Sequence, residues 1–515
     1  MVESVNVITT DNNKRIAKNT SLLYLRMILV MGVSFFTSRI VIQSLGVEDY
    51  GIYSVVGGII AMFSFINGSM VVSTQRYITF ELGKGDICLL RKVFSTSIQI
   101  HGLISLIIVC LGETIGLWFL QNKMIIPEER MVAAMWVYQC SIAVCVINIM
   151  AVPYNADIIA HEKMSAFAYI SIFEVLAKLA IVYLLYISPW DDRLIVYAVL
   201  LLIVQLIIRY IYMCYCHKHF EESNYQHQFD KTLLKEMAGF AGWSFWGNLA
   251  GVLSTQGVNI MLNIFFGPVV NAARGIAVQV QAVVQQFVAN FQMAVNPQIT
   301  KSYATGNIDT IYMLMFRSAR YSFYLLFVFA LPIFLETEYL LALWLTEVPK
   351  NTVEFARIMI LISLIYAISN PYVIANQATG KVRRYQIIVG GSLLLTLPIS
   401  YIVLKLGAPA FSVFVVQFLI ECVAQILRIV LLKQNIDLSI MKSIANIYLP
   451  ILLVIVISSI LPVIVCCSLP CNFVRLIAVV CTSILSVCIT VFLVGIKKNE
   501  RLFINKKLIQ LFINK

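Results

Sequence analysis

The side chains best able to do chemistry in this sequence are amides and an arginine that recur at helical spacing inside apolar segments. One set of residues follows spacings of three, four and seven: Asn271, Arg274, Gln281, Gln285, Gln292 and Asn296. A second set lies just before it: Asn248, Thr255, Asn259 and Asn263. Helix–helix hydrogen bonding is the simpler explanation for any one of these amides. Two adjacent polar stripes together favour a water-filled cavity.

Three arginines lie inside apolar segments and could hold an anion. Arginine stays protonated and binds phosphate through two parallel hydrogen bonds. Arg39 and Arg274 are the stronger candidates, whereas snorkelling to the interface explains Arg26 equally well. We therefore predict a substrate with hydroxyls and a phosphate. The predicted substrate contacts are Arg39, Arg274, Gln281, Gln285, Asn259, Asn263 and Arg26.

Carboxylates are rare in the apolar segments. Glu113 and Glu421 have no obvious local partner, which makes them candidates for coupling to a proton or sodium ion, although packing partners on other helices explain them equally well. Glu174 and Lys178 are four residues apart on one predicted helix and are expected to neutralise each other.

Catalytic and metal chemistry find little support in the sequence. The clearest acidic pairs on the outer side, Glu48-Asp49 and Asp191-Asp192, are on connections of only a few residues, and no phosphate-binding glycine loop occurs. The 12 cysteines lie mostly in apolar segments without metal-ligand spacing. We predict a protein that is not an enzyme, with no catalytic residues, no metal site and no cofactor beyond a possible coupling ion.

The elements that must position these residues are membrane-spanning helices. The chain has 515 residues, of which 60% are hydrophobic and 12% charged. A spanning helix needs about 20 apolar residues, and about 14 such segments can be read along the chain. They lie at 20–45, 50–74, 93–118, 131–153, 166–187, 194–216, 240–264, 272–294, 312–335, 354–376, 385–405, 409–432, 444–467 and 473–495. The fold class predicted is an all-α, polytopic membrane protein without a soluble domain.

The net charge of +12 is mainly a signal of topology. With both termini in the cytoplasm, the basic residues favour the cytoplasmic side by roughly four to one, as the positive-inside rule requires. This count places Arg317, Arg320 and Arg428 on the cytoplasmic side. Nucleic acid is therefore not an expected partner, whereas the lipid bilayer is.

The sequence contains an internal repeat. A shift of about 220 residues aligns Gly46 with Gly267, Gly85 with Gly306, and Pro153-Tyr154 with Pro371-Tyr372. We expect two parallel six-helix lobes with a site between them, plus two extra helices. The predicted domains are an N-terminal lobe at 1–216, a cytoplasmic linker at 217–236, a C-terminal lobe at 237–432, and extra helices with a basic tail at 433–515. The segments 74–86 and 296–307 should form matching cytoplasmic turns, with Pro297 breaking its helix.

Several motifs resemble those of Wzx-type polysaccharide flippases, a family in the multidrug/oligosaccharidyl-lipid/polysaccharide (MOP) exporter superfamily. They are Ser38-Arg39-Ile40, Leu45-Gly46-Val47-Glu48-Asp49-Tyr50-Gly51, Thr74-Gln75-Arg76-Tyr77, Phe265-Phe266-Gly267-Pro268 and Asn296-Pro297-Gln298-Ile299. The resemblance covers nearly the whole chain, and its motifs are structural rather than catalytic.

The resemblance implies a flippase that moves undecaprenyl-diphosphate-linked oligosaccharides across the bacterial inner membrane by alternating access, for lipopolysaccharide O-antigen or another surface polysaccharide. Its expected partners are the lipid-linked oligosaccharide and polysaccharide polymerase machinery. Drug exporters of the same superfamily generally have a carboxylate in the first helix. The first helix of this chain has arginines instead, which favours this anionic substrate. The alternatives are an ion-coupled multidrug exporter of the same superfamily and an integral-membrane glycosyltransferase.

Overall fold

The computed structural model describes most of the chain between residues 18 and 501. The gaps are 35–36, 38–39, 42–43, 47–48, 50–51, 54–55, 57–63, 123–125, 188–191, 226–229, 346–347 and 498–499. Every regular element in this described part is helical, as the composition predicts. The chain divides into two compact units, Met1–Asn248 and Leu249–Lys515, with the boundary inside one long helix. The domain boundaries expected from the sequence stay a prediction.

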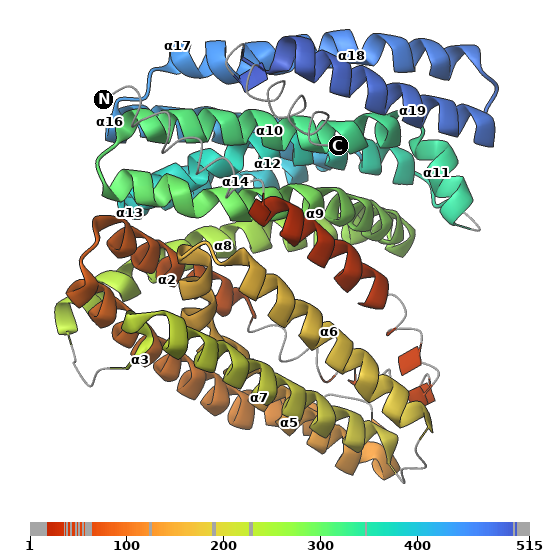
Figure 1. Ribbon diagram of the computed structural model, residues 1–515. Helices are drawn as coiled ribbons and strands as arrows, with labels where there is room; N and C mark the ends of the chain where they lie inside the picture. The colour runs from red at the N-terminus through yellow and green to blue at the C-terminus, as the bar shows by residue number, and fades with distance from the viewer. Residues whose placement is uncertain are drawn as a thin grey trace, which may run out of the picture. The chain divides into compact units, whose positions relative to one another are not determined.

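The first unit begins with a helix at 18–34 and continues with long helices and short irregular turns. These are α2 (Ser64–Lys84), α3 (Ile87–Leu111), η1 (Gly112–Gly116), α4 (Leu117–Asn122), η2 (Glu128–Arg130), α5 (Met131–Ala160), α6 (Met164–Ile187), α7 (Arg193–His219), η3 (Glu221–Ser223) and the start of α8 (Lys231–Phe266). Helix α5 packs against α2, α3 and α7, while α6 packs against α7 (Figure 1). The core of this unit therefore lies around α5.

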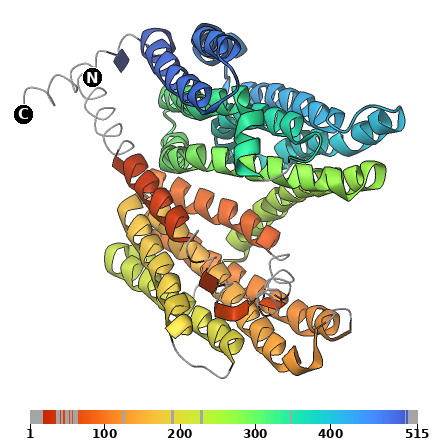
Figure 2. The ribbon, with the colours of Figure 1, turned by 90° about the vertical axis from the view of Figure 1, so that its right-hand side faces the viewer.

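The second unit contains the rest of α8 and the remaining helices. These are α9 (Pro268–Ala304), α10 (Ile308–Leu335), α11 (Thr337–Trp344), α12 (Thr352–Ala378), α13 (Val382–Tyr385), η4 (Gln386–Gly390), α14 (Gly391–Leu394), α15 (Thr396–Lys405), α16 (Ser412–Ile436), α17 (Ile440–Ser443), η5 (Ile444–Tyr448), α18 (Leu449–Ser468), α19 (Phe473–Thr490) and η6 (Val491–Gly495). Helix α12 packs against α9, α10 and α16. The last two long helices, α18 and α19, pair with each other beside α10 (Figures 1 and 2).

Eleven helical stretches within the described residues are long and apolar enough to span a bilayer. The predicted crossings at 20–45 and 50–74 lie partly outside the described residues. The crossing predicted at 272–294 forms the longer helix α9, whose amide stripe lowers its hydropathy. The chain is thus a multi-pass membrane protein.

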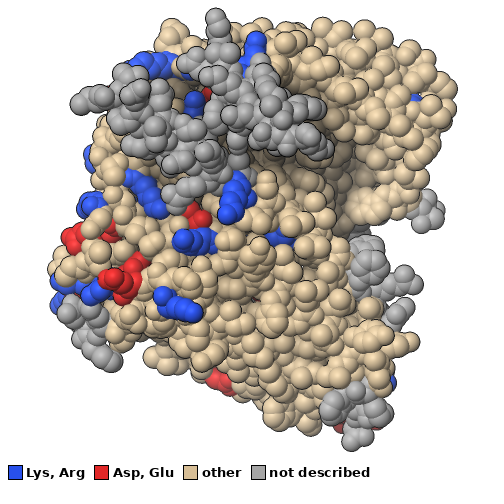
Figure 3. Space-filling view, viewed as in Figure 1, with Lys and Arg blue, Asp and Glu red and all other residues tan. Residues whose placement is uncertain are grey.

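The outer faces of the helices are apolar, as contact with lipid requires. On α6, Tyr169, Phe173 and Leu176 follow helical spacing and are 64%, 48% and 50% exposed. On the face shown in Figure 3, charged side chains gather to one side, over the turn between α2 and α3, while uncharged surface covers most of the rest. This distribution fits a surface that meets hydrocarbon along the helices and water at their ends.

The internal repeat recurs as repeated local structure. Gly85 after α2 and Gly306 after α9 both have positive φ, at +78° and +71°. The next residue caps a helix in both copies: the Asp86 side chain accepts from the Leu89 amide, and the Asn307 side chain accepts from the Thr310 amide. Each copy therefore uses the same glycine turn and the same N-cap, which a chance match in apolar sequence does not explain.

The expectation that Pro297 breaks its helix is wrong. Helix α9 continues past this proline to Ala304. Proline removes one backbone hydrogen bond and disfavours helix in the residue before it, but the helix on both sides is held by packing against α10 and α12. The break falls instead at Gly306, where positive φ is required.

The segment that follows α19 is fixed to α10 by buried charges. Arg320 is 1% exposed, and its Nη2 lies 3.3 Å from Glu500 Oε2. Arg317 donates to the same carboxylate at 2.6 Å, and Arg320 and Tyr324 both donate to the carbonyl of Gly495. Burial alone would raise the pKa of Glu500, but Arg320 and Arg317 outweigh it and lower that pKa.

We expect Glu500→Gln to lower the thermal unfolding temperature at pH 7 by removing the partner of two arginines, at a cost on the order of 3 kcal/mol. A carboxylate with a lowered pKa stabilises the fold above its unfolded pKa, and this stability is lost as the pH falls through the folded value. The difference between the two proteins should therefore shrink in acid. Thermal scans in detergent across pH test this, with the exposed Glu338→Gln as control. Equal unfolding temperatures at pH 7 would contradict it.

Candidate functional site

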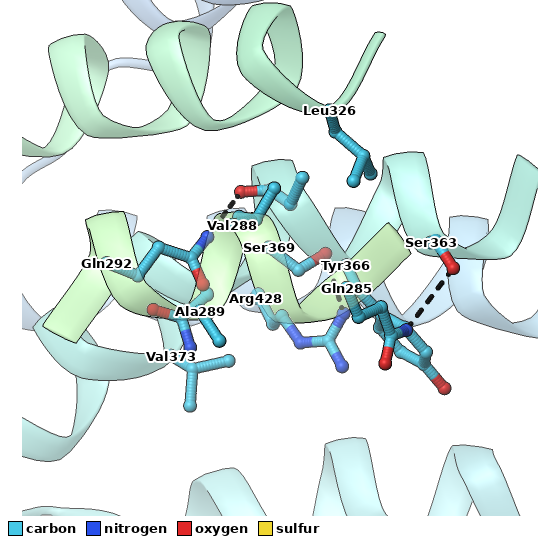
Figure 4. A pocket seen from close by; sticks show the side chains of 12 residues that line it. Gln285, Val288, Ala289, Gln292, Leu326, Ser363, Tyr366, Ser369, Val373 and Arg428 are labelled. Carbon is cyan, nitrogen blue, oxygen red and sulfur yellow. Dashed lines mark hydrogen bonds between the residues drawn. The ribbon is translucent and has the colours of Figure 1, made fainter. Parts of the chain in front are cut away.

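A polar cavity of about 350 Å³ lies in the second unit, between α9, α10, α12 and α16. Figure 4 shows the side chains around it. The polar lining residues are Gln285, Gln292, Ser363, Tyr366, Ser369, Asn370 and Arg428. The volume falls in the range of small-molecule binding sites, about 300–1,000 Å³.

Helical spacing brings these residues to one place. Gln285 and Gln292 are seven residues apart on α9, so both point to the same side, two turns apart. On α12, Ser363, Tyr366 and Asn370 recur at spacings of three and four. Because α9 and α12 pack side by side, their polar faces meet across the cavity.

Hydrogen bonds fix the two glutamines in this wall. Gln285 donates to the Ser363 hydroxyl at 3.3 Å (Figure 4). Gln292 donates to the Ser322 hydroxyl at 3.1 Å and to the Ala367 carbonyl at 3.0 Å. Both were expected on the polar face from their spacing. Part of that stripe therefore serves helix–helix bonding and cavity lining at once.

The cation of the cavity is Arg428 of α16. Its Nη1 donates to the Ser369 hydroxyl at 3.1 Å, and its Nη2 lies 3.5 Å from Glu421 Oε2. The Tyr385 hydroxyl also lies against the guanidinium. The buried Nε of Arg428 has no hydrogen-bond partner among the described residues. The guanidinium is thus held in position and still has a free donor.

A second lining residue, Asn370, carries an unpaired acceptor. The buried Oδ1 of this residue has no hydrogen-bond partner within the described part of the chain. An unpaired buried polar atom costs about 1–3 kcal/mol unless water or a ligand satisfies it. Two residues that line the cavity therefore carry a buried, unpaired polar atom, a donor on Arg428 and an acceptor on Asn370.

Glu421, a predicted ion-coupling residue, has partners close by. It is 2% exposed, accepts a hydrogen bond from Tyr366 at 2.9 Å, and pairs with Arg428 two turns along α16. No local partner was apparent in the sequence, because Arg428 was counted among the basic residues of the cytoplasmic side. The structure shows Arg428 5% exposed and lining the cavity, and the side of the membrane to which it lies nearer stays a prediction. Glu421 and Arg428 are seven residues apart, and this spacing predicts that both side chains lie on one face of the helix.

Arg274 lies away from the cavity. Its Nη2 donates to the Thr255 carbonyl at 2.8 Å, which joins the two predicted polar stripes of α8 and α9. Arg274 precedes Gln285 by eleven residues, or about 16 Å along a helix. Gln281 and Asn259 are half-buried on the same two helices.

The other predicted contacts are dispersed. Arg39 and the side chain of Asn263 lie outside the described residues. Arg26 stacks over the Phe167 ring at 4.7 Å, and its Nε and Nη1 are buried without a hydrogen-bond partner among the described residues. Glu113, the second predicted ion-coupling residue, is exposed and accepts a hydrogen bond from Gln139 at 3.2 Å. Their functional roles remain predictions.

Three ion pairs bear on the other expectations. Lys178 and Glu174 lie 2.6 Å apart, which confirms the predicted pair. Arg130 pairs with Asp49 at 2.5 Å and with Asp192 at 2.9 Å. Two of the acids considered for an outer catalytic site are therefore engaged with an arginine.

Comparisons with known proteins agree with this architecture. Residues 244–402 match the MatE family model. A MATE structure in the bent conformation has a TM-score of 0.70 and 13% identity, with 83% of this chain and 96% of that chain covered. A structure described as an outward-facing multidrug resistance MATE family transporter of the MOP superfamily has a TM-score of 0.67 and 15% identity, with 82% and 96% covered.

A third solved structure is a MOP superfamily transporter from Pyrococcus furiosus, described as having a binding pocket of reverse polarity that suggests a different function. It has a TM-score of 0.63 and 14% identity, with 82% of this chain and 96% of that chain covered. No curated protein matches the sequence. The chain therefore has the fold of MATE transporters of the MOP superfamily, and its residues 244–402 match the MatE family.

Proposed function

We propose that this protein is a flippase that moves an undecaprenyl-diphosphate-linked oligosaccharide from the cytoplasmic to the periplasmic leaflet by alternating access. The observation that carries the proposal is the cavity lined by Arg428 and Asn370. The guanidinium of Arg428 suits a phosphate oxygen, and the side-chain amide of Asn370 suits a sugar hydroxyl.

The rest of the lining suits the same ligand. Gln285, Gln292, Ser363 and Ser369 supply amides and hydroxyls, the groups that bind sugar hydroxyls. A guanidinium compensates a diphosphate, whose transfer out of water is otherwise very unfavourable. The prenyl tail stays in lipid while the head group enters the cavity. Arg274 and Arg39 belong to the proposal as further contacts for the head group elsewhere on its path.

Glu421 gives a means to release the anion. It holds Arg428 only at 3.5 Å, a long ion pair that a phosphate can replace with shorter, bidentate contacts. When the substrate leaves, the carboxylate pairs with the arginine again. Protonation of Glu421 would couple this exchange to a proton gradient, and Glu113 is the second candidate for the coupling ion.

The proposed setting follows from this activity. The protein acts in the bacterial inner membrane with both termini in the cytoplasm, and it supplies a polysaccharide polymerase with flipped repeat units for O-antigen or a related surface polysaccharide. It is a transporter without catalytic residues. The glycosyltransferase alternative needs free outer acids, and the engagement of Asp49 and Asp192 with Arg130 argues against it.

The second candidate function is an ion-coupled multidrug exporter. The buried carboxylate of Glu421 beside Tyr366 favours it, because a carboxylate in a transporter cavity can exchange a proton for a cationic drug. The solved structures of similar fold include one described as a multidrug resistance transporter. The two functions differ in the sign of the substrate charge.

Transport by purified protein in liposomes separates the two. We expect a fluorescent undecaprenyl-diphosphate oligosaccharide to cross the bilayer in a protein-dependent manner, and a lipophilic cationic dye not to be transported. Arg274→Ala should abolish flipping at normal membrane abundance, and Arg274→Lys should restore it only in part, because an ammonium loses the planar fork. Transport of the dye alone would count against the flippase proposal. Unchanged flipping by Arg274→Ala would exclude Arg274 as a contact for the head group.

A further inference from the structure

Three potential metal ligands meet in the first unit, away from the cavity described above. They are Asp157 near the end of α5, His161 one turn later, and Glu222 of η3. One ligand atom from each lies within 4.8 Å of the other two. His161 Nε2 is 2.5 Å from Glu222 Oε1 and 3.8 Å from Asp157 Oδ1. Two carboxylates thus face one imidazole nitrogen.

The Asp157 carboxylate is buried in an unusual way. The residue is 0% exposed, and neither of its oxygens accepts a hydrogen bond from a donor in the described part of the chain. Glu222 is 4% exposed. The site therefore brings two buried carboxyl groups and one imidazole together.

The local fold holds the three groups in place. Glu162, with φ of +58°, turns the chain sharply after α5, and its carbonyl accepts from Asn19 at 3.1 Å. The Phe220 ring stacks on the His161 ring at 4.1 Å between centroids. Ser223, which is fully buried, donates to the Phe220 carbonyl and closes the turn that carries Glu222. Neither the imidazole nor the Glu222 turn is free to move far from Asp157.

We propose that Asp157, His161 and Glu222 form a binding site for a divalent transition metal of the zinc class. One nitrogen and two carboxylate oxygens are a ligand set that Zn²⁺ accepts, with distances of about 2.0–2.2 Å. An ion at this position gives the unpaired oxygens of Asp157 a partner. The ion enters when the Glu222 side chain rotates, because this rotation widens the short contact between His161 and Glu222.

The site would be structural rather than part of transport. Glu222 belongs to the connection between α7 and α8, so the ion would fasten this connection to the inner end of α5. A water can take the fourth position of a tetrahedral ion.

Zinc binding to the full-length protein tests the site. Protein purified in detergent, treated with chelator and dialysed against Zn²⁺ should bind one tight equivalent, and the ion should raise its thermal unfolding temperature. Asp157→Asn and His161→Gln should each weaken binding by about 100-fold or more, since even the loss of a residue that only orients a metal ligand costs about 10–100-fold. Both should also lose the zinc-dependent rise in unfolding temperature.

The matched control is Glu221→Gln, which removes the neighbouring exposed carboxylate that pairs with Arg91. It should bind zinc as the wild type does. Tetrahedral visible absorption of the Co²⁺-loaded wild type, lost in Asp157→Asn, gives a readout independent of stability. Failure of the wild type to bind zinc would overturn the proposal in favour of a proton shared between Asp157 and Glu222. Zinc binding that survives in Asp157→Asn and His161→Gln would overturn the proposal too, because the cysteines would then be the zinc ligands.

Discussion

Replacing Arg428 with alanine should abolish transport of the diphosphate-linked substrate, with a loss of about 100-fold or more, since truncating one member of a buried charge pair costs about 2–5 kcal/mol. Arg428→Lys should keep part of the activity. It retains the charge, but one ammonium cannot contact Ser369, Glu421 and a phosphate in the fixed planar geometry of a guanidinium. Flipping in liposomes, normalised to the amount of inserted protein, measures both.

The alanine variant also leaves Glu421 buried without its cation, which can weaken folding. The double variant Arg428→Ala with Glu421→Gln removes this problem, because both charges are absent. It should unfold at nearly the wild-type temperature and still fail to flip. Lys433→Ala is the matched control, since Lys433 is an exposed basic residue on the same helix. Normal flipping by the double variant would exclude Arg428 from the substrate path.

The fold could be predicted because membrane helices are specified by local composition. Apolar runs set the crossings, and the repeated glycine turns at Gly85 and Gly306 were visible as aligned positions. Helix ends were harder to place. Helix α9 passes through Pro297, because neighbouring helices hold it on both sides, and no single-sequence rule reports that packing.

The cavity was predictable only in part. Gln285 and Gln292 were found because amides at a spacing of seven stand out in an apolar helix. Arg428 was missed because a basic residue near a helix end is indistinguishable, in sequence, from a topology signal. Its burial follows from the packing of α16 against α12 and from the carboxylate two turns earlier.

The cluster of Asp157, His161 and Glu222 shows a different limit. Asp157 and His161 are four residues apart, a spacing common in any helix, and Glu222 lies on another segment of the chain. Only the turn at Glu162 and the stacking of Phe220 on His161 bring the third ligand to the first two. Such a site requires tertiary structure to be recognised.

Glu421→Gln should tighten binding of an undecaprenyl-diphosphate analogue about tenfold, which corresponds to about 1.4 kcal/mol. The carboxylate competes with the phosphate for the guanidinium of Arg428, and glutamine removes that competitor while keeping the hydrogen bond from Tyr366. Turnover should fall, because no carboxylate is then present to pair with Arg428 when the phosphate leaves. Transport by the variant should also lose its dependence on a pH gradient, since this position can no longer take up a proton.

The same variant separates the two candidate functions most sharply. A cation exporter needs a negative charge in its cavity, so Glu421→Gln would abolish drug transport and leave an unpaired arginine that repels the substrate. Binding is measured by titration of purified protein and transport in liposomes, with Glu354→Gln, an exposed carboxylate on α12, as control. Weaker binding of the diphosphate analogue to Glu421→Gln would refute competition at Arg428, because an anion can only gain when a neighbouring carboxylate is neutralised.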